Sequence, residues 1–377
     1  MKTGYLEGYY GRLLSWEDRS ILLKKLSQLE MDFYIYGPKE DPLHRMNWSS
    51  LYNNSQLENF KKFKEEALNL GIKPYFSLSP GIGFKGDQED ITNIKKKFDQ
   101  LLKLGFEDFA LFFDDLDDER SYELALVHGK VLESISKFLE EKTSSPLIFC
   151  PTVYCNSFAR GALKDSSYLK GLSASVPVNL PLLWTGKNVV SESISDKDVQ
   201  ELKNIISNPI FIWDNYYAND YCPYKFFIGA FSSRTFTRKS VQGLGINPTG
   251  MPLTDSIILE QVKGQRNTKE ILKDYGVPEA FNELLPFFKG PFDDGIIMDS
   301  IEDIENLLAY KQDLCIDWKG KLQLEWAPFL WSFFNDLKLL KNLTLRKDKN
   351  TLEAWTSRRY SDPLSKSIFL DNNKGEK

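Results

Sequence analysis

One short stretch constrains the fold of this chain more than any other. The apolar residues Phe109–Phe113 run directly into Asp114 and Asp115, and two further aspartates, Asp117 and Asp118, follow. An apolar run this short that ends abruptly in charge is typical of a strand buried on both faces, as in a parallel sheet. Consecutive strand residues point to opposite faces, so Asp114 and Asp115 can face one substrate only where the backbone turns. Because the carboxyl ends of parallel strands carry the chemistry of α/β enzymes, the stretch predicts a site at the mouth of a sheet.

Three other interpretations of the acidic run stay open at this point. Aspartates after a strand can simply cap the next helix. The same letters fit the Asp-Asp-x-x-Asp pattern that holds magnesium diphosphate in isoprenoid synthases. That pattern lies on a helix and needs a second acidic cluster, whereas Phe109–Phe113 has β character. A calcium loop is disfavoured because no glycine follows at the required turn position.

Composition narrows the class of protein. The 377 residues carry a formal net charge of -5, which gives no electrostatic reason to expect nucleic acid or an anionic membrane as a partner. The first residues have no apolar core of a secretory signal, and no apolar run approaches the length of a membrane span. The four cysteines lack Cys-x-x-Cys spacing and a nearby histidine cluster. We therefore expect a cytoplasmic protein with reduced thiols, no metal and no cofactor.

Short apolar runs alternate with helical patterns from the N-terminus to about Gly264. The patterns predict helices opened by capping boxes at Ser15 and Ser55, and further helices over 91–103 and 121–142. This alternation favours a (β/α)₈ TIM-like barrel over residues 1–264. The eight predicted strands are Gly4–Tyr10, Phe33–Tyr36, Lys73–Leu78, Phe109–Phe113, Leu147–Cys150, Pro181–Trp184, Ile210–Trp213 and Val241–Ile246.

A glycine motif at Gly81–Gly86 matches the Gly-x-Gly-x-x-Gly fingerprint of dinucleotide-binding proteins. In that fingerprint the glycines open the helix directly, whereas here the helix begins only near Asp90. We interpret the motif as a strand-to-helix loop and expect no nucleotide site.

Beyond Gly264 the strand patterns stop, and residues 265–377 are predicted to form a C-terminal α-helical region with a polar tail from Asp371 to Lys377. Apolar residues at helical spacing predict a buried face on its last helix. The predicted helices are Asn267–Tyr275, Pro278–Phe288, Ser300–Lys311 and Leu324–Leu343, and the apolar residues are Trp326, Phe329, Leu330, Phe333, Leu337 and Leu340.

The ends of the predicted strands share aromatic, amide and carboxylate side chains and one lysine. Such a lining suits a neutral polyhydroxylated ligand, which offers rings to stack on and hydroxyls to hydrogen-bond. The six clusters are Glu7–Arg12, Tyr36–Asp41, Pro151–Tyr154, Trp184–Gly186, Trp213–Asp220 and Asn247–Pro248.

Over roughly residues 4–259 the chain resembles the O-GlcNAcase and β-N-acetylglucosaminidase family of glycoside hydrolases, family 84. The motifs that carry the resemblance are Glu-Gly-Tyr-Tyr-Gly-Arg at 7–12, Tyr-Gly-Pro-Lys-Glu-Asp-Pro at 36–42, Leu-Phe-Phe-Asp-Asp-Leu-Asp at 111–117, Phe-Cys-Pro-Thr-Val-Tyr-Cys at 149–155 and Trp-Asp-Asn-Tyr-Tyr-Ala-Asn-Asp at 213–220. Leu13-Leu14 stands where the family usually has Pro-Trp, and Glu40 where it often has Asp. These departures concern loops around the site and bear on the preference for the aglycone.

The resemblance implies a retaining hydrolysis in which the substrate's 2-acetamido oxygen is the nucleophile. Asp114 would orient and polarise the acetamido N–H, and Asp115 would act first as general acid and then as general base. Tyr154 would hold the acetamido oxygen, Asn215 would brace the aspartate pair and Trp213 would line the acetamido pocket. Neighbouring carboxylates suit this chemistry, because neither has to attack the opposite face of the sugar ring. Two carboxylates a few ångströms apart cannot both ionise easily, which would keep one proton available.

The resemblance also implies how the sugar is held. Ring hydroxyls would be bound by Lys39, Asp220, Asn247 and the backbone of Gly8. The expected partner is a glycoside or glycoprotein with terminal N-acetylglucosamine, and a homo-oligomer stays open. The alternatives are a catalytically inactive barrel that binds N-acetylglucosamine and the magnesium-dependent isoprenoid synthase described above.

Overall fold

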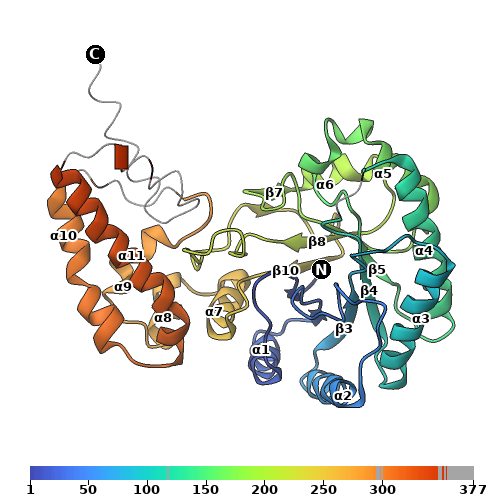
Figure 1. Cartoon of the computed structure of the whole chain (residues 1–377), viewed down its shortest axis with the longest axis horizontal. Coiled ribbons are helices and arrows are strands. Elements are labelled where there is room, and N and C mark those ends of the chain that lie inside the picture. The colour runs from blue at the N-terminus through green and yellow to red at the C-terminus, as the bar shows by residue number, and fades with distance from the viewer. Residues whose placement is uncertain (117–118, 294–297, 299, 347–349, 352–353, 355–377) are drawn as a thin grey trace. The chain divides into compact units, whose positions relative to one another are not determined.

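The computed structural model describes residues 1–116, 119–293, 298, 300–346, 350–351 and 354. Two compact units make up the chain (Figure 1). The first consists of Met1–Tyr216 with Ser232–Gly250, and the second of Tyr217–Phe231 with Met251–Lys377. The predicted division after Gly264 stays a prediction. In the structure, the segment 217–231 and the helix after Gly250 belong with the helices that follow.

The first unit is a closed barrel of parallel strands, which confirms the predicted (β/α)₈ architecture. All eight predicted strands are present, with ends that differ by up to three residues. In barrel order they are β1 (Lys2–Glu7), β10 (Gly243–Ile246), β8 (Ile210–Asp214), β6 (Leu182–Trp184), β5 (Ile148–Cys150), β4 (Asp108–Phe112), β3 (Lys73–Leu78) and β2 (Phe33–Tyr36). A small parallel pair, β7 (Ile194–Ser195) with β9 (Arg234–Thr235), was not predicted.

Helices follow most of the strands, and in Figure 1 helices α1 to α4 lie outside the strands. The capping box at Ser15 is confirmed, since Ser15 and Asp18 exchange side-chain to backbone bonds. The one at Ser55 is wrong: Asn53 is the N-cap, and its side chain pairs reciprocally with Gln56. The helices of this unit are α1 (Trp16–Gln28), α2 (Asn54–Asn69), α3 (Gln88–Lys103), α4 (Tyr122–Glu140), α5 (Ser167–Ser175) and α6 (Asp196–Lys203).

Alternation along the strands sorts the side chains of the barrel. On β2, Phe33 and Ile35 belong to the cluster inside the barrel, while Tyr34 and Tyr36 contact rings of α2. On β4, Ala110 and Phe112 point inward. Rings fill much of the barrel centre, and small residues make room for them, since a Cβ at Gly243 would lie 2.3 Å from the ring of Phe211. The other residues of this cluster are Leu6, Tyr75, Ile148, Cys150, Tyr154, Cys155, Leu183, Phe211 and Trp213.

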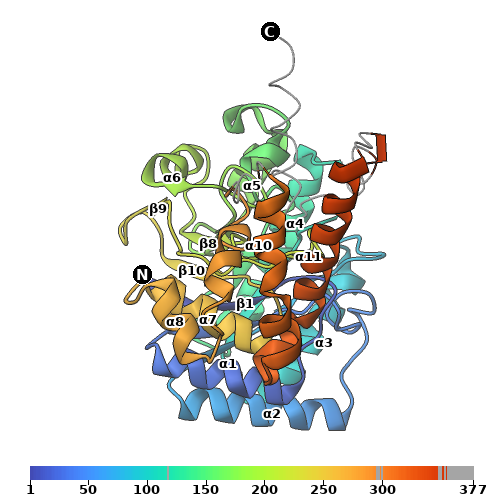
Figure 2. The ribbon, with the colours of Figure 1, turned by 90° about the vertical axis from the view of Figure 1, so that its left-hand side faces the viewer.

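The second unit is helical, as predicted for the C-terminal region. In this unit α10 and α11 lie side by side (Figure 2). All six residues of the predicted apolar stripe on α11 are buried. Trp326 stacks near Phe226 and Phe281, with ring centroids 4.8 Å apart in each case. The helices are α7 (Pro252–Lys263), α8 (Thr268–Asp274), α9 (Phe281–Leu284), α10 (Ile301–Ala309) and α11 (Lys321–Arg346).

The remaining sequence predictions concern the second acidic pair, the polar tail, membrane spans and the cysteines. Asp117, Asp118 and the polar tail Asp371–Lys377 lie outside the described residues. Within the described ranges, no helix combines the length and apolar character needed to cross a membrane. All four cysteines are buried and form no disulfide with one another, in agreement with the expected reduced thiols.

Candidate active site

The turn after β4 presents both aspartates at the mouth of the barrel. Ala110 and Phe112 point inward, and the alternation carries Asp114 to the same side, where it is 4% exposed. Asp115 would point the opposite way in a continued strand. Its backbone instead adopts φ 52°, in the left-handed region that few residues other than glycine visit. The predicted turn between the two carboxylates is therefore present.

Asp114 is paired with a buried cation. The ammonium of Lys39, which follows β2, lies 2.5 Å from Oδ2 of Asp114, and both side chains are buried. The rings of Phe112 and Trp213 are each 5.6 Å from the ammonium. A charge-assisted contact in such apolar surroundings is strong and fixes the Asp114 carboxylate in one orientation.

Asp115 is exposed, and two phenols hold its carboxylate. Tyr154 donates to Oδ1 at 2.6 Å, and Tyr10 donates to Oδ2 at 2.9 Å. Burial, reinforced by the charge of Asp115, raises the pKa of both hydroxyls far above the ordinary value. Both phenols thus stay protonated near neutral pH and act as donors. The two aspartates are adjacent in sequence but differ in exposure and in the chemistry of their partners.

A chain of amide hydrogen bonds connects three more predicted residues. The Gly8 N–H donates to Oδ1 of Asn247 at 2.9 Å, and Nδ2 of Asn247 donates to Oδ1 of Asn215 at 2.8 Å. Nδ2 of Asn215 donates to the carbonyl oxygen of Val189. The structure thus brings these three together across the ends of β1, β8 and β10. The predicted contact of Asn215 with the aspartates is not among these bonds, and that role stays a prediction.

Trp213 occupies an inward-facing position near the end of β8 and packs against Phe112, with ring centroids 5.2 Å apart. Gly8 is required beside it, because a Cβ there would lie 2.3 Å from Cζ2 of the indole. The indole Nε1 is buried and has no hydrogen-bond partner among the described residues. Trp213 therefore forms an apolar wall next to Lys39 and Asp114.

Not every carboxylate in the predicted clusters faces the mouth. Glu7 is fully buried and pairs with Arg19 of α1 at 2.7 Å, so it joins barrel to helix instead of lining the site. Asp214 forms a two-pronged ion pair with Arg234, at 2.8 Å for each contact. Asp220 is exposed and belongs to the second unit, and its sugar-binding role stays a prediction.

Removal of one partner of the Asp214–Arg234 ion pair should lower the free energy of unfolding by several kcal/mol. Both side chains are buried, so Arg234→Met leaves an uncompensated charge on Asp214. We expect roughly 3–5 kcal/mol lower free energy of unfolding, measured by urea denaturation. The double variant Asp214→Asn with Arg234→Met removes both charges and should recover part of the loss. A double variant less stable than Arg234→Met alone would contradict this explanation.

Sequence reasoning assigned no role to three residues that contact the aspartates. Tyr10 lies inside the motif at residues 7–12, so its position near a strand end was predictable although its bond to Asp115 was not. Arg45 and Ser79 lay outside every motif. Arg45 donates to the carbonyl oxygens of Asp114 and Asp115, and Ser79 lies 3.5 Å from Oδ1 of Asp114. No local pattern points to either residue, because the contacts join segments far apart in sequence.

No group of three or more His, Cys, Asp or Glu among the described residues is arranged to hold a metal ion. The carboxylates of Asp114 and Asp115 already face an ammonium and two phenols. Within the described residues, the donors around this pair suit proton transfer and hydrogen bonding.

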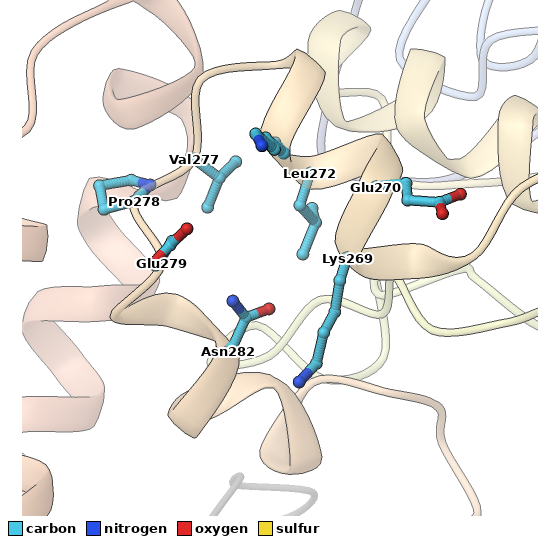
Figure 3. A pocket seen from close by; sticks show the side chains of 8 residues that line it. Lys269, Glu270, Leu272, Val277, Pro278, Glu279 and Asn282 are labelled. Carbon is cyan, nitrogen blue, oxygen red and sulfur yellow. The ribbon is translucent and has the colours of Figure 1, made fainter.

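A separate pocket of about 240 Å³ lies in the second unit, between α8 and α9 (Figure 3). Leu272, Val277 and Pro278 form its apolar part, and Lys269, Glu279 and Asn282 surround it. The charged side chains of this pocket lie at the surface. It contains none of the residues predicted for the site.

Comparison with known proteins identifies the chain's relatives. The family model described as beta-N-acetylglucosaminidase matches residues 3–285. The proteins named Protein O-GlcNAcase of Rattus norvegicus and Mus musculus are each 32% identical over 240 residues, which cover 62% of this chain and 26% of the relative. The chain thus spans about a quarter of the length of these curated relatives. A solved structure of a mutant O-GlcNAc hydrolase from Thermobaculum terrenum shares the fold, with a TM-score of 0.75 and 22% identity over 97% of this chain and 87% of that one.

Proposed function

The chain belongs to the β-N-acetylglucosaminidase family, and from that premise we propose that it is a retaining glycoside hydrolase that removes terminal β-linked N-acetylglucosamine. The observation that carries the proposal is the different setting of two adjacent carboxylates at one strand end. Asp114 is buried against Lys39, whereas Asp115 is exposed between two phenols. This arrangement supports separate roles for the two aspartates.

In the first step, the acetamido oxygen of the substrate attacks the anomeric carbon and the bond to the leaving oxygen breaks. Asp115 enters this step in its protonated form and gives its proton to that oxygen, as its exposed position permits. Asp114 accepts a hydrogen bond from the acetamido N–H and stabilises the positive charge that develops as the oxygen attacks. Tyr154 turns its hydroxyl from Asp115 to the acetamido oxygen, and Trp213 covers the acetamido methyl.

In the second step, water attacks the anomeric carbon of the cyclic intermediate, and the bond between that carbon and the acetamido oxygen breaks, which restores the acetamido group. Asp115, now ionised, takes a proton from the water and returns to its starting state. Two displacements at the same carbon restore the original configuration. Lys39, Asp220, Asn247 and the backbone of Gly8 are the proposed partners of the ring hydroxyls, and Asn215 supports Asn247 through their 2.8 Å bond.

The alternative functions receive less support. An isoprenoid synthase needs its aspartates on a helix, but Asp108–Phe112 is a strand of a closed barrel. A barrel that only binds N-acetylglucosamine does not need two adjacent carboxylates in two different settings, one buried against an ammonium and one exposed between phenols. The names of the rodent relatives suggest O-linked N-acetylglucosamine on protein as one substrate. A hydrolysis screen over an aryl N-acetylglucosaminide, an N-acetylgalactosaminide, chitobiose and an O-GlcNAc peptide tests both the activity and the aglycone.

Activity should be independent of added metal. Because the aspartates are assigned to proton transfer and amide polarisation, hydrolysis of an aryl N-acetyl-β-glucosaminide should survive excess chelator with an unchanged rate. The measurement is the initial rate before and after dialysis against chelator. Loss of activity that magnesium or calcium restores would contradict the assigned roles.

A further inference from the structure

Arg45 places its guanidinium against the turn that carries both aspartates. It comes from the segment between β2 and α2. Its Nη2 donates to the carbonyl oxygen of Asp115 at 3.0 Å, and its Nη1 lies 3.4 Å from the carbonyl oxygen of Asp114. Nη1 also donates to Oγ of Ser79 at 2.9 Å. One planar group thus joins the ends of β3 and β4.

The backbone at this turn needs an external support. Asp115 has φ 52°, a conformation that is sterically unfavourable for a residue with a Cβ. The carbonyl oxygens of Asp114 and Asp115 both approach the same cation, which offsets the repulsion between their dipoles. The rigid fork of an Arg side chain matches two such acceptors in a way that a Lys ammonium does not.

Arg45 and Lys39 reach the aspartates from the same loop but contact different groups. Lys39 pairs with the Asp114 carboxylate, whereas Arg45 bonds to backbone oxygens. The carboxylate of Asp115 is thereby left to the hydroxyls of Tyr10 and Tyr154. Arg45 thus contacts the backbone from which the Asp115 side chain extends, and not the carboxylate itself.

The loop itself is anchored independently of Arg45. The Asp41 carboxylate accepts bonds from the hydroxyls of Tyr36 and Tyr52 at 2.8 and 2.7 Å. The buried Lys97 of α3 donates to the carbonyl oxygen of Leu43. A substitution at Arg45 should thus leave these anchors in place.

The first glycine of the motif at Gly81–Gly86 makes room for this arginine. A Cβ at Gly81 would lie 3.3 Å from Cγ and 3.4 Å from the carbonyl oxygen of Arg45, closer than most packed Cβ atoms approach a neighbour. The glycine loop after β3, which resembled a nucleotide motif in the sequence, thus lies against the aliphatic stem of Arg45.

We propose that Arg45 is a positioning residue for the general acid: it holds the Asp114–Asp115 turn so that the Asp115 carboxyl faces the leaving oxygen. This inference rests on the proposed function. Because a misplaced acid matters most when the leaving group needs its proton, the defect should depend on the leaving group. A general loosening of the fold would affect all substrates alike.

The test compares Arg45→Met and Arg45→Lys with the unmodified chain on an alkyl and a dinitrophenyl N-acetyl-β-glucosaminide. For Arg45→Met we expect kcat/KM, which reports the first step, to fall about ten- to a hundredfold on the alkyl glycoside and only a few fold on the dinitrophenyl glycoside. KM for the alkyl glycoside should change little. Arg45→Lys keeps the charge without the fork and should fall between the other two.

Lys97→Met is the matched control, because it removes an anchor of the same loop without touching the turn. Its losses, if any, should be equal for the two leaving groups. Equal losses for both glycosides in Arg45→Met, or the same leaving-group dependence in Lys97→Met, would overturn the inference while the proposed function stands. If Arg45→Met does not fold, the same criterion applies to Arg45→Lys. Absence of hydrolysis by the unmodified chain would overturn the proposed function together with this inference.

Discussion

Asp115→Asn is expected to lower kcat/KM by roughly two to four orders of magnitude on substrates with poor leaving groups. The amide cannot supply a proton, so an alkyl or seryl oxygen would have to depart as an alkoxide. An activated aryl oxide departs without a proton, and for such substrates the loss in the first step should be small. The measurement is kcat/KM over a series of leaving groups, in which the variant should show a much steeper dependence than the unmodified enzyme.

Azide provides the control for the same variant. It needs no general base, so it should attack the cyclic intermediate, restore the second step and yield a β-glycosyl azide. One of the two phenols, Tyr154 or Tyr10, keeps an acceptor in the asparagine oxygen, and the amide NH2 can donate to the hydroxyl oxygen of the other, so the side chain stays between the same partners. A leaving-group dependence equal to that of the unmodified enzyme would show that Asp115 is not the general acid.

Asp114→Asn is expected to fail in a different way. We expect roughly two to three orders of magnitude lower kcat/KM for every leaving group, because the defect lies in activation of the internal nucleophile. Azide should not restore this variant. The substitution also leaves the buried Lys39 ammonium without its counter-charge, so folding must be checked by circular dichroism and thermal melting.

Asp114→Asn has a clear contradicting outcome. If its leaving-group slope and azide response match those of Asp115→Asn, the two aspartates do not have separate roles. The different environments of the two side chains, one buried against an ammonium and the other exposed between phenols, would then have no consequence for the chemistry.

The barrel could be predicted because each strand leaves a local signal. Phe33–Tyr36 and Lys73–Leu78 are bounded by charged or turn residues, and their structural limits equal the predicted ones. Helix starts are less certain, since several residues near one another can act as the cap. Asn53, and not Ser55, is the cap of α2. Both residues belong to a polar run that offers more than one capping pattern, so the sequence alone did not distinguish them.

The candidate site was predictable where its residues follow strands. Asp114 and Asp115 were named from their position after a strand, whereas Lys39, Tyr154, Asn247 and Gly8 belong to strand-end clusters and were singled out by the family resemblance. The structure places these residues at the mouth of the barrel. Which member faces the mouth was not predictable. Glu7 and Asp214 lie in the same motifs yet bind Arg19 and Arg234, since the alternation of the strand turns them away from it.

The contact between Arg45 and the backbone of Asp115 could not be predicted from the sequence. It lies 70 positions from Asp115 in the chain, and its bond is to a backbone oxygen that carries no sequence signal. Contacts of this kind depend on how loops of adjacent strands pack. Such contacts can be identified only from the three-dimensional structure.

The central claim is that the substrate supplies its own nucleophile, and fluorination of the N-acetyl methyl tests it most directly. Each fluorine withdraws electrons from the acetamido oxygen without changing the leaving group. We predict that kcat/KM of the unmodified enzyme falls steeply from the acetyl to the mono-, di- and trifluoroacetyl aryl glycosides. A flat series, or a sugar covalently trapped on an aspartate, would show that the enzyme provides the nucleophile instead.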